Sequence, residues 1–154
     1  MASVRAGFSN TKDELAPDLL VQFGPTLMVQ IGFDPDFQPG GLHPNLPSVP
    51  SPALIDTGAT ESCIDSTLAL NLNLPVVDRQ TVSGAHGSHA LNYHLAQIYV
   101  PDLQYTVYGL FAGVHLTVGG QPHNAIMGRT FLQGFTMTYE GTTGSVTISR
   151  DNDA

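Results

Sequence analysis

The residues of this chain best suited to chemistry are an acid and two small residues that follow an apolar stretch. Residues 52–55 (Pro-Ala-Leu-Ile) lead directly into Asp56, and Thr57 and Gly58 come next. A carboxylate at the point where a buried strand breaks into a turn is partly removed from water, so neighbouring groups can tune its pKa. Gly58 lets another backbone or a substrate come close. Asp56 is therefore the first candidate for acid–base chemistry, although the same three residue types are common in ordinary turns.

The segments around this turn read mainly as short strands. Sixteen glycines and eleven prolines in 154 residues, with no tryptophan, favour many turns and short strands over helical bundles. A short helix is expected over residues 66–72 and a helical turn over 130–133. The pattern predicts an all-β fold, a small barrel with one or two short helices. The expected strands cover residues 25–33, 52–55, 62–65, 76–82, 91–100, 105–111, 114–118, 125–129, 135–139 and 145–149.

The chain is long enough for one domain with a real core. Residues 1–23 are polar and predict an irregular N-terminal leader, with at most a helical turn near residues 12–16. Residues 24–149 form the predicted domain, and residues 150–154 a C-terminal tail. Within the domain, residues 34–52 are dense in proline and glycine and predict a long surface loop. Residues 81–91 span the glycine-rich tip of a hairpin.

Composition and charge exclude several classes of partner. The net charge is −8 with only five lysines and arginines, and no basic cluster is present, which disfavours nucleic acid and anionic membranes as partners. Neither a signal peptide nor an apolar run of bilayer length is visible, so we expect a soluble, cytoplasmic protein. Cys63 is the single cysteine, which excludes an intrachain disulfide and a cysteine-based zinc site. We expect Cys63 to pack as a small apolar residue.

The six histidines raise the question of a metal site. His86 and His89 are three residues apart, but they lie in a hairpin tip rather than on one helix face, and no carboxylate or cysteine joins them at ligand spacing. We therefore predict no metal and no cofactor. The two histidines are interpreted as solvated loop residues that reach substrate when the hairpin closes. Asp65 and Asp102 have no partnering motif, and a cap or turn role is expected for them.

Three separated segments together resemble one protein family. They are residues 54–59 (Leu-Ile-Asp-Thr-Gly-Ala), residues 81–87 (Thr-Val-Ser-Gly-Ala-His-Gly), and residues 125–129 (Ala-Ile-Met-Gly-Arg) followed by Phe131-Leu132. In this order and spacing the chain resembles retropepsins, the dimeric retroviral-type aspartic proteases, from about residue 25 to residue 148. The resemblance implies a closed β-barrel of the acid-protease type, one lobe per chain, with a flap hairpin over residues 81–91. The long loop and leader suggest a cellular or bacterial relative.

The resemblance also implies a role for each matched residue. Asp56 would pair with its copy in a second subunit, so that two carboxylates share one proton and activate water. Thr57 would form a hydrogen bond across the dimer, and Gly58 would offer its carbonyl to substrate. Ile126, Gly128 and Arg129 would support the turn from below, with Glu61 or a backbone carbonyl as the partner of Arg129. The substrate-binding set would be Ala59, Ser83, Gly84, Ala85, His86 and Gly87.

The sequence thus leads to a homodimeric aspartic endopeptidase that hydrolyses an extended polypeptide in a largely apolar cleft. The alternative is a dimeric module of the same fold that binds or scaffolds and cleaves little or nothing, because a fold can persist after activity is lost. The intact Asp56, Thr57 and Gly58, together with the glycine-rich hairpin, favour the enzyme.

Overall fold

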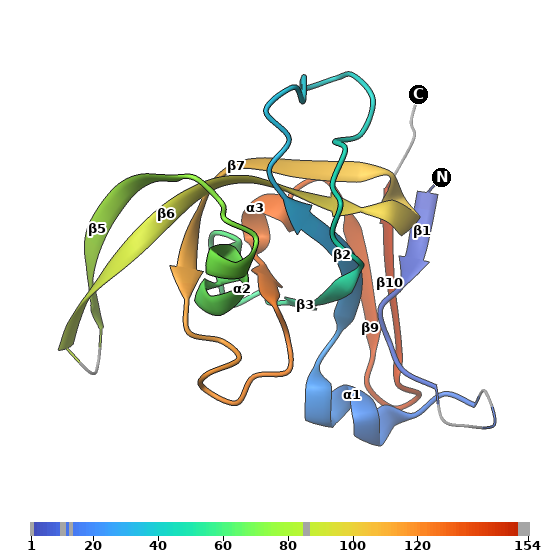
Figure 1. Cartoon of the computed structure of the whole chain (residues 1–154). Coiled ribbons are helices and arrows are strands. Elements are labelled where there is room, and N and C mark those ends of the chain that lie inside the picture. Colours follow the sequence, from blue (N-terminus) through green and yellow to red (C-terminus); the bar gives the residue numbers. More distant parts are fainter. Residues whose placement is uncertain (1, 10–11, 13, 85–86, 151–154) are drawn as a thin grey trace.

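The computed structural model describes residues 2–9, 12, 14–84 and 87–150 (Figure 1). Ten strands and three short α-helices are present in this part of the chain, with one 3-10 turn, η1 (Pro101–Leu103). The strands are β1 (Ala2–Arg5), β2 (Thr26–Gly32), β3 (Ser51–Ile55), β4 (Cys63–Asp65), β5 (Val76–Gly84), β6 (Gly87–Val100), β7 (Tyr105–Val114), β8 (Ala125–Met127), β9 (Thr136–Glu140) and β10 (Ser145–Arg150). The helices are α1 (Pro17–Phe23), α2 (Ser66–Asn71) and α3 (Arg129–Leu132).

Six strands close into a ring, and a seventh extends it. The order in the larger sheet is β2-β3-β8-β4-β7-β6-β5, and an additional pairing of β2 with β6 closes the ring. Most neighbours are antiparallel, but β3 runs parallel to β8, and β4 parallel to β7. The predicted all-β class and closed barrel are therefore confirmed. Of the seven strands in this larger sheet, only β5 lies outside the ring, hydrogen-bonded to β6.

The core is built from the inward faces of the ring strands and continues to β10, α1 and α3. In β2 the residues Leu27, Val29 and Ile31 are buried while Met28 between them is about half exposed, which is the period-2 pattern of a strand with one face inward. Ile98 and Phe131 are among the largest fully buried side chains. Burying a side chain of this size stabilises the folded state by roughly 1.5–3 kcal/mol. Repeated around the ring, this burial fixes the strands that carry the candidate site.

The predicted irregular leader is wrong. Residues 2–5 form β1, which pairs with β10 and gives a second sheet in the order β1-β10-β9. Residues 17–23 form α1, which begins at Pro17 and is followed by Gly24 at φ 73°. Proline in the first helical position and glycine just past the end are favourable there, since the first N–H is unpaired in any helix and glycine tolerates a positive φ. Leu20 of α1 is buried in the core.

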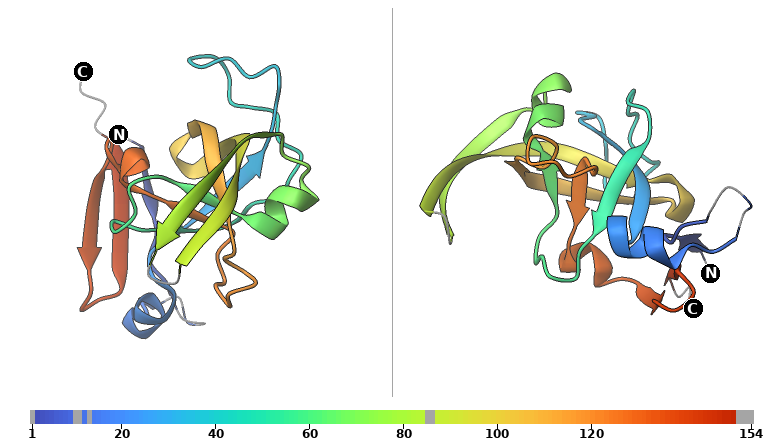
Figure 2. Two further views of the ribbon diagram at one scale, coloured as in Figure 1. Left: turned by 90° about the vertical axis from the view of Figure 1, so that its left-hand side faces the viewer. Right: turned by 90° about the horizontal axis from the view of Figure 1, so that it is seen from below.

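Strands β5 and β6 form a long hairpin that projects from the barrel (Figures 1 and 2). Its pairing runs from Val76↔His94 to Gly84↔Gly87, with an irregularity between Val76 and Asp78. The predicted flap, residues 81–91, is the outer end of this hairpin. Residues 85 and 86 lie outside the described part of the chain.

The predicted strand over residues 114–118 is also wrong, because β7 ends at Val114 and a turn follows. The carboxylate of Asp65 causes this turn. It accepts hydrogen bonds from the backbone of Leu116 (3.1 Å), the backbone of Thr117 (3.0 Å) and the hydroxyl of Thr117 (3.0 Å). Asp65 also caps α2 by accepting from the backbone of Leu68. The predicted cap or turn role of Asp65 is thus confirmed.

Candidate active site

Asp56 lies at the end of a strand that the barrel holds on both sides. Strand β3 pairs with β2 on one side and with β8 on the other, and Ile55 is opposite Met127 in the parallel pair. The backbone N–H of Asp56 donates to the carbonyl of Met127 at 2.9 Å. Ile55 and Met127 are both buried. The main chain is therefore fixed up to Asp56, where the side chain emerges half-buried.

The segment of residues 56–62, which we call the Asp56 turn, folds around the carboxylate. Oδ1 of Asp56 accepts from the backbone N–H of Gly58 at 2.8 Å, and the N–H of Ala59 donates to the Asp56 carbonyl at 3.2 Å. This is the local turn that aspartate commonly forms. In the described part of the chain Oδ2 has no hydrogen-bond partner. One carboxylate oxygen of Asp56 is thus used to build the turn.

The space beside that carboxylate favours glycine at position 58. A Cβ added to Gly58 would lie 3.0 Å from Oδ1 of Asp56, tighter than about nine in ten real contacts of this kind. Thr57 and Gly58 are both exposed, and the hydroxyl of Thr57 has no hydrogen-bond partner among the described residues. The tip of the turn therefore presents a carboxylate, a hydroxyl and bare backbone to the outside.

The start of α3 holds the other side of the turn through successive backbone donors. The N–H of Gly128 donates to the Ser62 hydroxyl at 3.1 Å, the N–H of Arg129 to the Ala59 carbonyl at 2.9 Å, and the N–H of Thr130 to the Thr60 carbonyl at 3.0 Å. The first N–H groups of a helix have no partner within it, so they are available for such contacts.

Gly128 makes this approach possible. An added Cβ there would lie 2.7 Å from the carbonyl carbon and oxygen of Glu61 and 2.9 Å from the Ala59 oxygen. These atoms are backbone and cannot rotate away. The predicted supporting position of Gly128 thus corresponds to a real lack of space. Ile126 contributes through pairing, opposite Leu54 on one side and Cys63 on the other.

The guanidinium of Arg129 spans the Asp56 turn. One nitrogen donates to the Thr57 carbonyl at 2.7 Å and another to the Thr60 hydroxyl at 3.0 Å. The sequence left the partner open between Glu61 and a backbone carbonyl, and the structure gives the carbonyl. Glu61 instead accepts a long hydrogen bond of 3.4 Å from the Thr130 hydroxyl. Arg129 therefore acts as a clamp on the turn, and its planar fork suits two acceptors at once.

Several contributors to the turn were missed by the sequence analysis. Ser62 is buried and accepts from Gly128, while Thr60 and Thr130 take part in the hydrogen bonds just described. The only sequence signal for Thr60 and Ser62 is their position shortly after Gly58, and for Thr130 its position next to Arg129. The partner of each depends on how β8 and α3 pack against the turn, which local sequence does not specify.

Cys63 lies next to the site but is unsuited to nucleophilic chemistry. Burial raises the pKa of its thiol to about 11, the nearby charge of Asp56 adds to this rise, and a hydrogen bond with the backbone of Ile126 opposes it. The nucleophilic form of cysteine is the thiolate, so at neutral pH this side chain is protonated and inert.

The predicted substrate-binding residues fall into two groups. Ala59 is part of the Asp56 turn and is half-buried. Ser83, Gly84 and Gly87 lie at the outer end of the hairpin, where the hydroxyls of Ser83 and Ser88 are 3.2 Å apart. In the described part of the chain no hydrogen bond joins these hairpin residues to the turn. Ala85 and His86 were also predicted to bind substrate, and they lie outside the described residues.

The electrostatics around the barrel are uneven. Burial opposes ionisation of Asp65, but the hydrogen bonds from Thr117, Leu68 and Leu116 outweigh it and hold the pKa of this carboxyl below its usual value of 3.8. Burial lowers the pKa of His123 below its usual 6.5.

Among the described residues, no group of three or more histidines, cysteines and acids is placed to hold a metal ion. No helix in the same residues is long and apolar enough to span a membrane.

No protein-family model matches this chain, and no curated protein matches it in sequence. Solved structures with a similar fold include two proteases. The protease of EIAV in complex with the inhibitor HBY-793 is 20% identical over 71% of this chain and 85% of that chain, with a TM-score of 0.43. A retropepsin-like aspartic protease from Rickettsia conorii is 9% identical over 95% of this chain and 89% of that chain, with a TM-score of 0.48.

Proposed function

We propose that this chain is an aspartic endopeptidase of the retropepsin type that works as a homodimer. The observation that carries the proposal is the Asp56 turn, in which β8 and α3 hold one carboxylate rigidly while its Oδ2 stays without a partner in the described residues. Peptide hydrolysis by an aspartate dyad needs two carboxylates in contact, and each chain offers one in this setting. A second copy of the chain supplies the other across a two-fold axis.

In the dimer, the two Asp56 carboxylates share one proton, because two like charges about 3 Å apart resist simultaneous ionisation. The ionised member takes a proton from a water molecule, whose oxygen attacks the carbonyl carbon of the peptide bond. The protonated member donates its proton to the carbonyl oxygen, which stabilises the charge that develops there. When the tetrahedral intermediate collapses, the carboxyl that took the water proton gives it to the amine nitrogen, and the C–N bond breaks. The other carboxylate takes a proton from one hydroxyl of the intermediate, so the dyad again holds one proton. The two pKa values belong to the pair rather than to either residue.

The remaining residues have roles in holding partner and substrate. The exposed hydroxyl of Thr57 bonds across the dimer, and the carbonyl of Gly58 pairs with the substrate backbone. Ala59 lines a small subsite, and the hairpin end (Ser83, Gly84, Ala85, His86 and Gly87) covers an extended polypeptide by strand-like pairing. Large exposed apolar residues lie in the hairpin and on the neighbouring α2 and β7, and they suit an apolar cleft: Val76, Val77, Val82, Leu70 and Leu110.

The experiment is cleavage of a degenerate peptide library between pH 4 and 7. The proteins are wild type, Asp56→Asn, Asp56→Ala and the control Asp102→Asn, which removes an equal charge from an exposed 3-10 turn. The oligomeric state of each is measured by sedimentation. We expect cleavage by wild type and Asp102→Asn and none by either Asp56 variant. Cleavage that survives Asp56→Ala contradicts the proposal, and an inactive wild-type dimer favours the binding module.

A further inference from the structure

The loop over residues 33–50 stands on the outer face of the barrel as a built arch. At its start, the side chain of Gln97 accepts from the backbone N–H of Asp34 at 2.7 Å and donates to the Asp34 carbonyl at 3.1 Å. At its end, the Ser48 hydroxyl donates to the Ile31 carbonyl at 2.7 Å, and the Gln30 amide donates to the Ser48 carbonyl at 3.1 Å. Both ends of the loop are therefore fixed to β2 and β6.

The interior of the arch is anchored as well. The carboxylate of Asp34 accepts from the backbone N–H groups of Asp36 and Asn45, both at 2.9 Å, which ties the two legs together. Leu46 is buried, and its side chain lies so close to Gly32 that an added Cβ there would be 3.0 Å from it. These contacts show that the space under the arch is preformed rather than closed by collapse of the loop.

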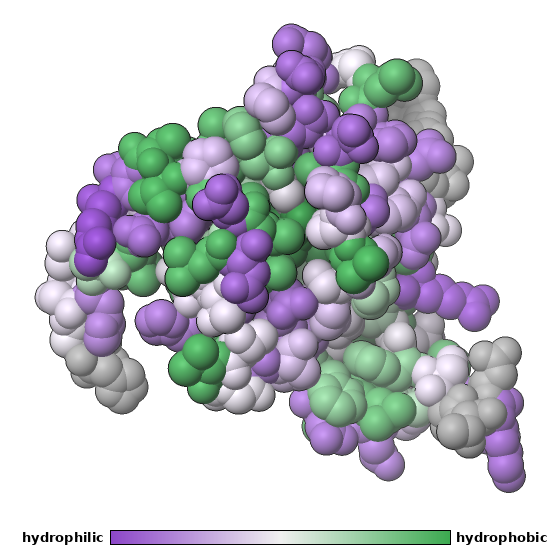
Figure 3. Space-filling model, viewed as in Figure 1, coloured by the Kyte–Doolittle hydropathy of each residue, from purple (hydrophilic) through white to green (hydrophobic). Residues whose placement is uncertain are grey.

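That space is a cavity of about 650 Å³, between residues 37–43 of the loop and the ends of β6, β7 and β10. Ligand pockets in proteins typically measure about 300–1,000 Å³, so the volume suits a small molecule. Figure 3 shows the arch as the upper end of the molecule, with both hydrophilic and hydrophobic residues on its surface. The cavity shares no residue with the Asp56 turn. It is therefore distinct from the candidate active site.

Aromatic rings form the walls of the cavity. Phe37 packs against Tyr108 with ring centroids 5.5 Å apart, and the ring of His43 stacks on Tyr99 at 4.9 Å. The guanidinium of Arg150 lies over the ring of Tyr105 at 5.3 Å. Three of the five tyrosines of the chain thus line one cavity. Such walls offer flat surfaces on which another ring can stack in an offset or edge-on geometry.

The charge of the lining is opposite to that of the chain. The chain carries thirteen acids and five lysines and arginines, yet the described residues of the lining include no carboxylate and do include the guanidinium of Arg150. His43 also lines the cavity, and its Nδ1, 3.0 Å from the Pro44 carbonyl, donates to it. Hydroxyl and amide groups from Thr106 and Gln104 complete a lining that can bind an anionic group without opposing it.

We propose that this cavity binds a small planar aromatic molecule that carries a negative charge, either a carboxylate or a phosphate monoester. The ring lies against Phe37 and Tyr108, and the acidic group pairs with Arg150. An uncharged aromatic molecule would make only the stacking contacts, and an inorganic anion would make only the ion pair with Arg150. Tight binding needs both features in one molecule, which defines the ligand class.

The probe is 1-anilinonaphthalene-8-sulfonate, an aromatic anion whose fluorescence rises when it leaves water. We expect saturable one-site binding to the native protein, with near-ultraviolet circular dichroism as the check that packing is intact. The neutral analogue 1-anilinonaphthalene, which lacks the sulfonate, should bind at least about tenfold more weakly, as expected for a lost charge-assisted contact. Absence of saturable binding in a natively folded sample, or equal binding of the two probes, overturns the proposal.

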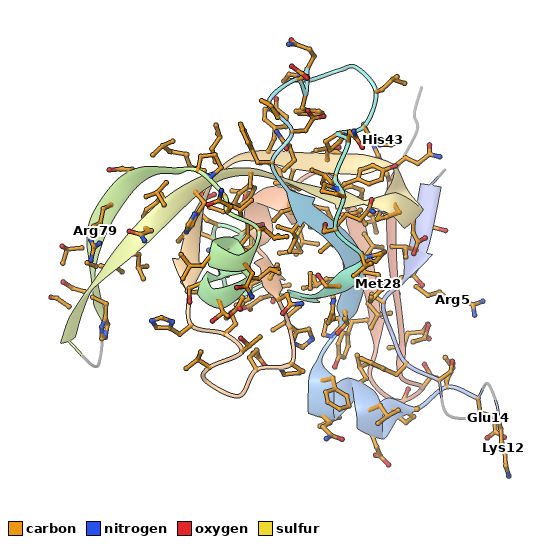
Figure 4. The ribbon with its side chains drawn as sticks, in the orientation of Figure 1. Arg5, Lys12, Glu14, Met28, His43 and Arg79 are labelled. Carbon is orange, nitrogen blue, oxygen red and sulfur yellow. The ribbon has the colours of Figure 1, made fainter. Side chains whose placement is uncertain are left out.

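Variants locate the probe. Arg150→Gln should weaken binding about tenfold, whereas the matched control Arg79→Gln, which removes the same charge from the hairpin, should leave binding within about twofold. Figure 4 shows Arg79 on the hairpin, far from His43 beneath the arch. Thr106→Trp places a large β-forming residue on the wall and should abolish binding by filling the cavity. Equal losses in the two arginine variants, or full binding by Thr106→Trp, would show that the probe sits elsewhere. Because Arg150 is exposed, its variant keeps the test valid if Thr106→Trp fails to fold.

Competition separates the two head groups. We expect 1-naphthoate or 1-naphthyl phosphate to displace the probe, and the one that acts at the lower concentration identifies the preferred acid. Inorganic phosphate, which has no ring, should displace it at least about a hundredfold less well, since it lacks the stacking contacts. Displacement by inorganic phosphate as effective as by 1-naphthyl phosphate would reduce the site to a simple anion contact and contradict the proposal.

Discussion

The Asp56 turn and the outer end of the β5–β6 hairpin both depend on glycine, but they use it in opposite ways. In the turn, space forces glycine at position 128, where an added Cβ would lie 2.7 Å from the Glu61 backbone, and favours it at position 58, where the Cβ would lie 3.0 Å from Asp56 Oδ1. In the hairpin, Gly87 has a φ of 103° and nothing within 4 Å of an added Cβ. One region uses glycine to pack backbone closely, and the other uses it to turn in open solvent.

The hydrogen bonds follow the same division. The turn is tied to β8 and α3 by Gly128, Arg129 and Thr130, and the guanidinium of Arg129 adds two further contacts. The described part of the hairpin end pairs only with itself, in the register Thr81↔Ala90 to Gly84↔Gly87. Stability varies across a structure with the density of buried contacts. We therefore expect the turn to open only with global unfolding and the hairpin end to open locally.

The largest expected effect is that of Gly128→Ala. The new methyl group would overlap fixed backbone, so we expect a loss of about 3 kcal/mol in the free energy of unfolding, at the upper end for overpacking. Urea denaturation measures it. The matched control is Gly134→Ala, where an added Cβ meets nothing within 4 Å, and a change within about 0.5 kcal/mol is expected. Similar values for the two variants would mean that the turn is not tightly packed.

Arg129→Lys should have the next largest effect. Lysine keeps the charge but cannot donate in a planar fork to both the Thr57 carbonyl and the Thr60 hydroxyl. We expect the free energy of unfolding measured by urea denaturation to fall by about 1–2 kcal/mol, as for a lost charged hydrogen bond. The backbone amide hydrogens of the turn should also exchange with solvent faster than in the wild type. If the lysine variant keeps both the stability and the slow hydrogen exchange of the wild type, the positive charge alone is sufficient at this position. The two hydrogen bonds of Arg129 would then not be what holds the turn.

A pH effect should come next, from His123 at the far end of the loop that precedes β8. Its Nε2 is 2.9 Å from the Thr26 hydroxyl, which already donates to the Gly24 carbonyl, so Nε2 carries the proton. Nδ1 is buried without a partner in the described residues. Burial lowers the pKa of His123, so below about 6.5 the unfolded chain binds the proton first and stability falls as pH falls.

His123→Gln removes this titration and should flatten the loss of stability below pH 6.5, while the exposed His89→Gln should not. Urea midpoints measured at intervals from pH 7.5 to 4.5 make the comparison. The lowered pKa of Asp65 acts in the same direction, but only below about pH 3.8, so the two contributions separate. If the urea midpoints of wild type and His123→Gln change with pH in parallel, His123 is not the cause of the loss of stability below pH 6.5.

The smallest effect is expected in the hairpin. Ser83→Ala removes the exposed contact with Ser88 and should change the free energy of unfolding by less than about 0.5 kcal/mol. Hydrogen exchange of residues 81–84 and 87–91 should be fast in both proteins. A loss above about 1 kcal/mol would show that the hairpin end is packed against something and would weaken the contrast with the turn.

Local pattern was enough to predict the parts of the fold that pack on one face. The inward alternation of β2 and the apolar ends of β3 and β8 are visible in the sequence, and so is α2 after Asp65. Strand β1 was missed because its partner β10 is at the other end of the chain, and four residues carry too little periodicity alone. Helix α1 had the Pro17 and Gly24 signals, which its polar neighbours obscured.

The candidate site shows the same limit. Asp56, Gly58 and Arg129 could be identified from residue type and order, but the acceptors of Arg129 could not, since Thr57 and Thr60 reach it only after α3 docks. The turn at residues 115–118 was misread as strand because β-prone residues there are overridden by the distant carboxylate of Asp65. Long-range hydrogen bonds decided these positions, and single-sequence patterns do not contain them.

The most direct test of the central claim, that each chain holds half of an active site, is a mixing experiment. Wild type and Asp56→Asn are unfolded together, refolded at fixed total concentration, and assayed for peptide cleavage. If both Asp56 residues are needed, activity falls as the square of the wild-type fraction, to about one quarter in an equal mixture, because mixed dimers are inactive. A linear fall to about one half would show that one chain is sufficient and would contradict the account.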